Sequence, residues 1–142
     1  MGNKLIGSVG LSIAGGTPSP YTRTTSFVIA CSDESTSITT GTKVTFRLPF
    51  DFTVTEVRAS LTTAGTGANL VTCDFEQNGT TILSTAITID AGELTSTTAT
   101  TPPVISTSEL SDDAAIDCDI DQIDSGGVAA GLKMYLIGYK TL

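Results

Sequence analysis

The sequence predicts an all-β domain, an antiparallel β-sandwich of about eight short strands behind an extended N-terminal arm. From about Tyr21 to Thr141, apolar and polar residues alternate in short Thr-rich segments, which is the period of half-buried strands. Turn signals rich in Gly, Asn and Asp separate these segments at short intervals. Among sandwiches, this spacing favours a jelly roll.

The predicted arm, residues 1–24, differs in composition from the sandwich domain at residues 25–142. It is rich in Gly and Ser, contains Pro18 and Pro20, and has only scattered apolar positions. This composition suits an extended segment and not a core element. We expect another protein chain to bind the arm through backbone pairing and apolar contact. The candidate contact residues are Leu5, Ile6, Val9, Leu11, Ile13 and Tyr21.

The strand candidates follow in order along the domain. The clearest is Thr42–Leu48, which alternates between two faces and is ended by Pro49. Asn78-Gly79 predicts a two-residue hairpin, because a type I′ turn needs a positive φ at both central positions. The predicted strands are Thr25–Ala30, Thr42–Leu48, Thr53–Leu61, Asn69–Gln77, Thr80–Ser84, Ile87–Ile89, Thr95–Ile105, Ala115–Ile123 and Leu132–Tyr139.

Two segments are less regular. Pro102-Pro103 should confine the Thr-rich strand Thr95–Ile105 to a sheet edge, and the polar Ser108–Asp113 is predicted as one helical turn. The inward-facing positions then predict the core. Its members are Val44, Phe46, Leu48, Val57, Leu61, Val71, Ile116, Ile120, Leu136 and either Tyr135 or Met134.

Composition excludes several classes of function. The formal net charge of −8 argues against nucleic acid and anionic membrane as partners, because both attract basic surfaces. The chain has no His, the commonest general base, and no Gly-x-Ser-x-Gly motif, so we expect no enzyme activity and no cofactor. Cys31, Cys73 and Cys118 lack CxxC spacing and are expected to be buried, reduced thiols.

One acidic cluster stands out in the second half of the chain. On a strand, Asp117, Asp119 and Asp121 share one face while Ile116 and Ile120 share the other. Carboxylates at this density are candidate Ca²⁺ ligands, although the spacing of an EF-hand loop is absent. The alternative, which we favour, is a solvated face or pairing with Lys43, Arg47 or Arg58 on a neighbouring strand. We therefore assign no metal.

Several segments together resemble a module of tailed-bacteriophage virion proteins. The resemblance covers roughly residues 26–140 and rests on the general pattern of these segments, since no catalytic motif supports it. The segments that carry it are Ile29–Thr36 with Val44–Pro49, Val57–Leu61, Thr88–Glu93, Leu132-Lys133 and Leu136-Ile137-Gly138. It implies a non-enzymatic structural protein with no catalytic residues.

The resemblance and the arm together lead to an expected function. We expect a capsid decoration (cement) protein that is assembled in the host cytoplasm and resides in the virion. It would bind the major capsid protein or other virion subunits through its arm and sheet edges. The alternative is a tail-fibre or receptor- and carbohydrate-binding jelly-roll domain. Exposed strand edges with few Lys residues also predict a homo-oligomer, with a trimer preferred and a dimer as the alternative.

Overall fold

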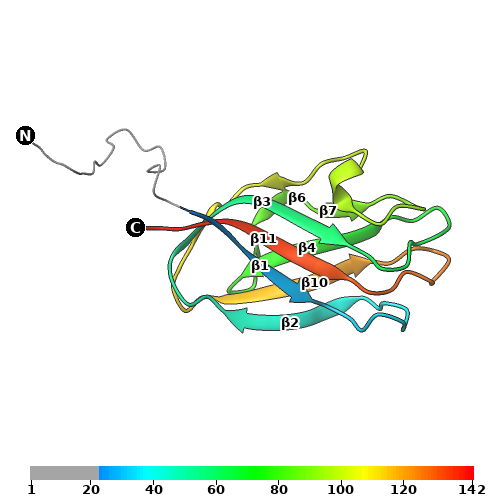
Figure 1. Cartoon of the computed structure of the whole chain (residues 1–142), viewed down its shortest axis with the longest axis horizontal. Coiled ribbons are helices and arrows are strands. Elements are labelled where there is room, and N and C mark those ends of the chain that lie inside the picture. The colour runs from blue at the N-terminus through cyan, green and yellow to red at the C-terminus, as the bar shows by residue number, and fades with distance from the viewer. Residues whose placement is uncertain (1–22) are drawn as a thin grey trace, which may run out of the picture.

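The computed structural model describes residues 23–142, which form an all-β sandwich of antiparallel strands (Figure 1). Eleven strands are assigned in this range, and six of them have seven residues or more. The longer strands are β1 (Thr24–Ala30), β2 (Gly41–Arg47), β3 (Phe52–Ser60), β4 (Val71–Gln77), β10 (Ala115–Gln122) and β11 (Lys133–Lys140). The shorter elements are β5 (Thr80–Thr81), β6 (Leu83–Thr85), β7 (Ile87–Ile89), the 3₁₀ turn η1 (Ser96–Thr98), β8 (Val104–Ile105) and β9 (Glu109–Leu110).

Two sheets face each other across the core. The first sheet has the order β1-β11-β3-β9, and the second has β2-β10-β4-β5, with β7 also paired to β4. A small third sheet pairs β6 with β8. Strands early in the chain thus pair with late ones, β1 with β11 and β2 with β10. In Figure 1, β1, β11 and β3 lie in one layer over β2, β10 and β4 in the other. No helix within residues 23–142 is long and apolar enough to cross a membrane.

The core consists of the inward-facing residues of both sheets. Of the predicted core positions, eight are buried: Leu48, Val57, Leu61, Val71, Ile116, Ile120, Leu136 and Met134. The choice between Tyr135 and Met134 resolves to Met134, because β11 turns its even-numbered side chains inward. The largest buried rings are Phe52 and Phe75, neither of which is exposed at all.

Val44 and Phe46 were predicted to be buried, but both are only half-buried. Their strand, β2, is at the edge of the second sheet, so no further strand covers their outer side. The Phe46 ring instead packs across the sandwich against Phe27 of β1, with a centroid separation of 5.9 Å. Phe50 and Phe52 extend this contact, at 6.0 and 5.3 Å from Phe27. Four of the five phenylalanines therefore form one aromatic cluster beneath β1.

The hairpin at Asn78-Gly79 is confirmed. Both residues have positive φ angles, 51° and 83°, as a type I′ turn requires. The Asn78 side chain also accepts a hydrogen bond from the Ala115 N–H (3.0 Å). This contact anchors the hairpin to the start of β10.

The predicted strand Thr95–Ile105 is wrong in its first part. Thr95 instead caps η1, its hydroxyl accepting the Thr97 N–H (3.2 Å), and Asp90 accepts the Thr100 N–H (2.9 Å). Polar side chains of this kind compete with a sheet for backbone groups. Only Val104–Ile105, after the two prolines, forms a strand.

Two other predicted elements also differ. Ser108–Asp113 contains β9 and not a helical turn, because Leu110 is buried where β9 pairs with Phe52 of β3. Thr80–Ser84 is divided at the buried Ile82 into β5, paired with β4, and β6, paired with β8.

The two environments of phenylalanine lead to a test of the core. Phe52→Ala should lower the free energy of unfolding by about 3–5 kcal/mol, because it leaves a cavity in a fully buried site. Phe46→Ala should cost on the order of 1–2 kcal/mol, since its ring is already partly in water. Urea unfolding at low protein concentration measures both. Equal costs would contradict this assignment of the sandwich edge.

Candidate functional site

The predicted arm residues Leu5, Ile6, Val9, Leu11, Ile13 and Tyr21 lie outside the described residues. Arg23 is the first residue described, and β1 begins at Thr24, the last residue of the predicted arm. Candidate sites in the described part of the chain are therefore on the surface of the sandwich itself.

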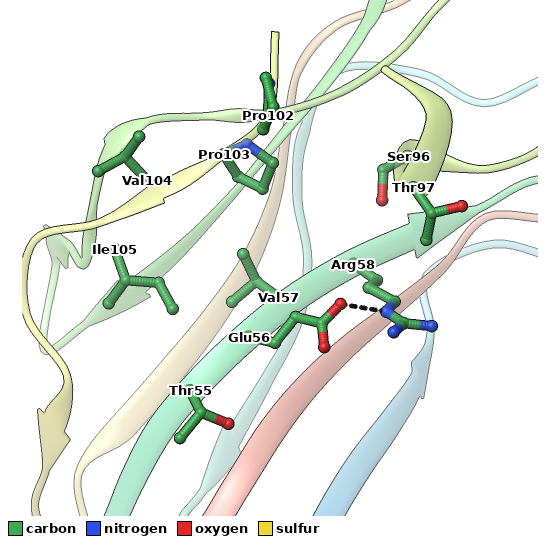
Figure 2. Close-up of a pocket in the computed structure, with 10 residues that line it drawn as sticks. All are labelled: Thr55, Glu56, Val57, Arg58, Ser96, Thr97, Pro102, Pro103, Val104 and Ile105. Carbon is green, nitrogen blue, oxygen red and sulfur yellow. Dashed lines mark hydrogen bonds and ion pairs between the residues drawn. The ribbon is translucent and has the colours of Figure 1, made fainter. Parts of the chain in front are cut away.

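A groove of about 560 Å³ lies over β3 (Figure 2). Thr55–Arg58 form its floor, Ser96 and Thr97 of η1 form one wall, and Pro102–Ile105 form the opposite wall. Val104 is half exposed there. A smaller hollow of about 200 Å³ shares Arg58 and Thr97 with the groove and adds Tyr135 of β11. The volume of the groove falls in the range of about 300–1,000 Å³ that is usual for small-molecule sites.

The groove is lined by an ion pair, hydroxyl groups and apolar side chains. Arg58 Nε donates to Glu56 Oε2 at 2.5 Å, and this pair is about half exposed. Because only Nε is engaged in that bond, the guanidinium keeps further N–H donors for a ligand. Ser96 Oγ accepts the Ala59 N–H (2.9 Å) and is buried, so its hydroxyl has a structural role. The groove thus offers donors, acceptors and apolar walls but no activated nucleophile.

The predicted acidic face is present on the outer side of the second sheet. Asp117, Asp119 and Asp121 point outward while Ile116, Cys118 and Ile120 are buried, as expected from the alternation. The register places Asp119 opposite Asp74 and Asp117 opposite Glu76 of β4. We refer to Asp74, Glu76, Asp117, Asp119 and Asp121 as the acidic strip.

The acidic strip is not paired with cations in the described part of the chain. Arg47 interacts with Asp113, Arg58 with Glu56, and Lys43 donates to Thr39 and Thr40, so pairing of these cations with the strip, one of the two readings that we favoured, is wrong. Thr45 and Thr81 donate to Asp117 and Asp74, at 2.5 and 2.7 Å. Within residues 23–142, no three acidic or cysteine side chains are arranged to hold a metal ion.

Three carboxyl groups of the strip, those of Asp74, Glu76 and Asp121, have pKa values raised mainly by loss of solvation. Loss of solvation, followed by the charge of neighbouring aspartates, raises the pKa of Glu76 and of Asp121 above the usual carboxyl range. Desolvation likewise raises the pKa of Asp74, where the Thr81 hydrogen bond only partly offsets it. Oδ1 of Asp119, in the middle of the strip, is buried and has no hydrogen-bond partner.

Asp124 behaves in the opposite way. Its side chain is buried, and it accepts the backbone N–H groups of Thr66 (3.0 Å), Val128 (3.1 Å) and Ala129 (3.2 Å). Burial opposes ionisation, but these hydrogen bonds together outweigh it and lower the pKa of Asp124. A Cβ at Gly65 would lie 2.6 Å from the Asp124 Cβ, so glycine is required there. Asp124 therefore connects the loop that contains Thr66 to the loop that contains Val128 and Ala129. The sequence analysis did not predict this role.

The three cysteines are buried and unpaired, as predicted. Burial raises the pKa of the Cys73 thiol. The thiols of Cys31 and Cys118 interact with each other, and this contact raises the pKa of Cys118. Their burial fits packing residues better than reactive thiols.

Comparison with known proteins found no match: no protein-family model, no characterised protein and no solved structure resembles this chain closely enough to be identified.

The acidic strip leads to a test by pH. Because the pKa values of Asp74, Glu76 and Asp121 are raised in the folded state, these groups ionise first in the unfolded chain as pH rises, and stability is lost from about pH 4 toward neutrality. Asp119→Asn should therefore raise the free energy of unfolding at pH 7 by a few tenths to about 1 kcal/mol. The gain should disappear near pH 4.

Asp112→Asn is the matched control, because Asp112 is exposed and lies outside the strip. Thermal unfolding at both pH values compares the two variants. The repulsion argument fails if both variants shift the melting temperature equally, or if the Asp119→Asn gain persists at acidic pH.

Proposed function

We propose that this chain is a non-enzymatic structural protein of a tailed-phage virion, a capsid decoration protein that resides on the assembled particle. The observation that carries the proposal is the pairing order of the strands. β1 pairs with β11, β2 with β10, β3 with β9 and β4 with β5, which is a nested series. A long antiparallel ribbon rolled into two facing sheets gives this order, and it supports the jelly-roll assignment. Jelly rolls are frequent in viral capsid proteins and in lectins.

The chemistry of the described residues agrees with a binding role. The whole sequence has no His, and the groove contains no activated nucleophile. The sandwich presents open strand edges, which can pair with another protein. The N-terminal arm, proposed here at residues 1–24, would supply the main contact with the major capsid protein. Its glycines allow close backbone approach, and its apolar residues can lie across a partner.

A deletion separates the arm from the sandwich. Removing residues 2–20 should leave a folded protein, because the buried apolar residues of the described range 23–142 all lie between Cys31 and Leu136. The truncated protein should no longer bind capsids assembled from the major capsid protein of the same genome. Co-sedimentation with capsids measures binding, and far-ultraviolet circular dichroism checks the fold. If the truncated protein binds with unchanged affinity, the arm is not the anchor; if the full chain fails to bind, the decoration role is wrong.

The groove favours a second candidate, a receptor- or carbohydrate-binding domain. The Glu56–Arg58 pair can donate and accept hydrogen bonds as sugar hydroxyls require, and Tyr135 lies beside it as a stacking surface. Under this alternative, Arg58→Ala should abolish binding of the full chain on a glycan array. Arg47→Ala is the matched control, since Arg47 lies on the other sheet. Absence of any glycan signal for the unmodified chain would exclude this candidate.

A further inference from the structure

The two sheets differ in how their open edges are protected. The first sheet ends at β1, a strand of seven residues without a charge or a proline. Among the described residues, β1 pairs only with β11. The second sheet ends at β2, which carries Lys43 and Arg47. Natural sheets usually protect their edges with charged residues, so a long uncharged edge indicates a surface that another strand covers.

The backbone of β1 offers a complete set of hydrogen-bonding groups along this edge. Cys31 N–H donates to Leu132 O (2.9 Å), so the odd-numbered positions face β11. In an antiparallel strand, consecutive residues direct their backbone groups to alternate sides. Thr24, Ser26, Val28 and Ala30 therefore direct their N–H and C=O groups toward the open edge, and all four are exposed. Val28 is 58% exposed, the largest exposed fraction of a large apolar side chain within β1.

We propose that β1 is the interface between two copies of this chain, pairing antiparallel with the same strand of the partner across a twofold axis at Phe27. In this register Ser26 faces Val28 of the partner subunit, and Thr24 faces Ala30 of the partner subunit. The pairing is self-complementary, as a twofold interface must be. It would add about eight backbone hydrogen bonds, two for each facing pair of outward-directed residues. The first sheets of both copies then become one continuous sheet.

The charges that flank β1 favour this antiparallel arrangement. Arg23 precedes the strand, and Asp33 with Glu34 follows it; Glu34 is paired with Lys133 of the same copy, so Asp33 supplies the net negative charge at that end. Antiparallel pairing brings Arg23 of each copy toward the acidic end of the other. Parallel pairing would instead place Arg23 beside Arg23, and like charges that face each other are destabilising.

The aromatic cluster supplies apolar surface at the same edge. Phe27, Phe46 and Phe50 are only half-buried, although the centroid of the Phe27 ring lies 5.9 Å from that of Phe46 and 6.0 Å from that of Phe50. A second copy along β1 would cover the exposed parts of these rings. The incomplete burial of Phe46 is then a property of the isolated subunit.

This interface does not depend on the proposed virion role, because it needs only the purified chain. It selects the dimer from the two oligomers that the sequence left open. If the chain did not bind capsids, the proposed β1–β1 interface would still stand. If the chain did not dimerise, the proposed binding to capsids would still stand.

A proline substitution tests the edge. Ser26→Pro removes an outward-directed N–H but leaves the β1–β11 hydrogen bonds, and edge strands tolerate proline. Sedimentation equilibrium should show a dimer for the unmodified chain and a dissociation constant at least about tenfold higher for Ser26→Pro. Ser26→Ala keeps the N–H and should remain a dimer. A monomeric unmodified chain at micromolar concentration, or an unchanged Ser26→Pro dimer, would overturn the proposal.

Crosslinking tests the register without a proline. Thr24→Cys and Ala30→Cys chains, mixed under oxidised glutathione, should form a disulfide between position 24 of one copy and position 30 of the other. Facing residues of a hydrogen-bonded pair have Cα atoms about 5.5 Å apart, which a disulfide can span. Either variant alone should not crosslink, because its two copies would lie about 20 Å apart along the strands. If the N-terminal arm of a neighbour occupies the edge instead, the mixture will not crosslink, and the β1–β1 interface is refuted.

Discussion

The alternation of inward and outward side chains along β10 and β11 is the constraint on which the sandwich depends. Each of these strands is paired on both sides, β11 between β1 and β3 and β10 between β2 and β4. A slip of one residue in either strand would turn its buried side chains to solvent and disturb two ladders at once. The same alternation forces the aspartates of β10 outward, opposite the acidic residues of β4. The electrostatic strain of the acidic strip therefore follows from the packing of the core.

Periodicity was sufficient to predict the parts of the fold that this alternation controls. The six longer strands were expected within one or two residues of their observed bounds, since each has a clear inward face. The irregular segments could not be predicted in this way. The side chains of Thr95 and Asp90 accept hydrogen bonds from nearby backbone N–H groups, which are then not available to a sheet. Strand β9 depends on the burial of a single residue, Leu110. Half-burial of Phe46 required knowing that β2 is an edge strand.

The candidate site was less predictable, because it is formed by segments that are distant in the sequence. The groove joins residues of β3 to η1 and to the segment after the two prolines, and no local motif marks this meeting. Asp124 illustrates the same difficulty. In the sequence it looks like the end of an acidic run, whereas in the structure three backbone N–H groups stabilise its charge. The outward face of Asp117, Asp119 and Asp121 was predicted correctly because it is a local property of one strand.

The pairing of the first and last long strands determines how the molecule can be extended. Thr24 pairs with Tyr139 and Ala30 pairs with Lys133, so the start of β1 and the end of β11 lie at the same end of the sandwich (Figure 1). The loops at residues 31–40 and 123–132 lie at the opposite end. A protein fused after Leu142 would emerge beside the start of β1. An epitope inserted at Thr39-Thr40, which are exposed, would project from the far end without separating Asp124 from Val128 and Ala129, so this loop is the better position for display.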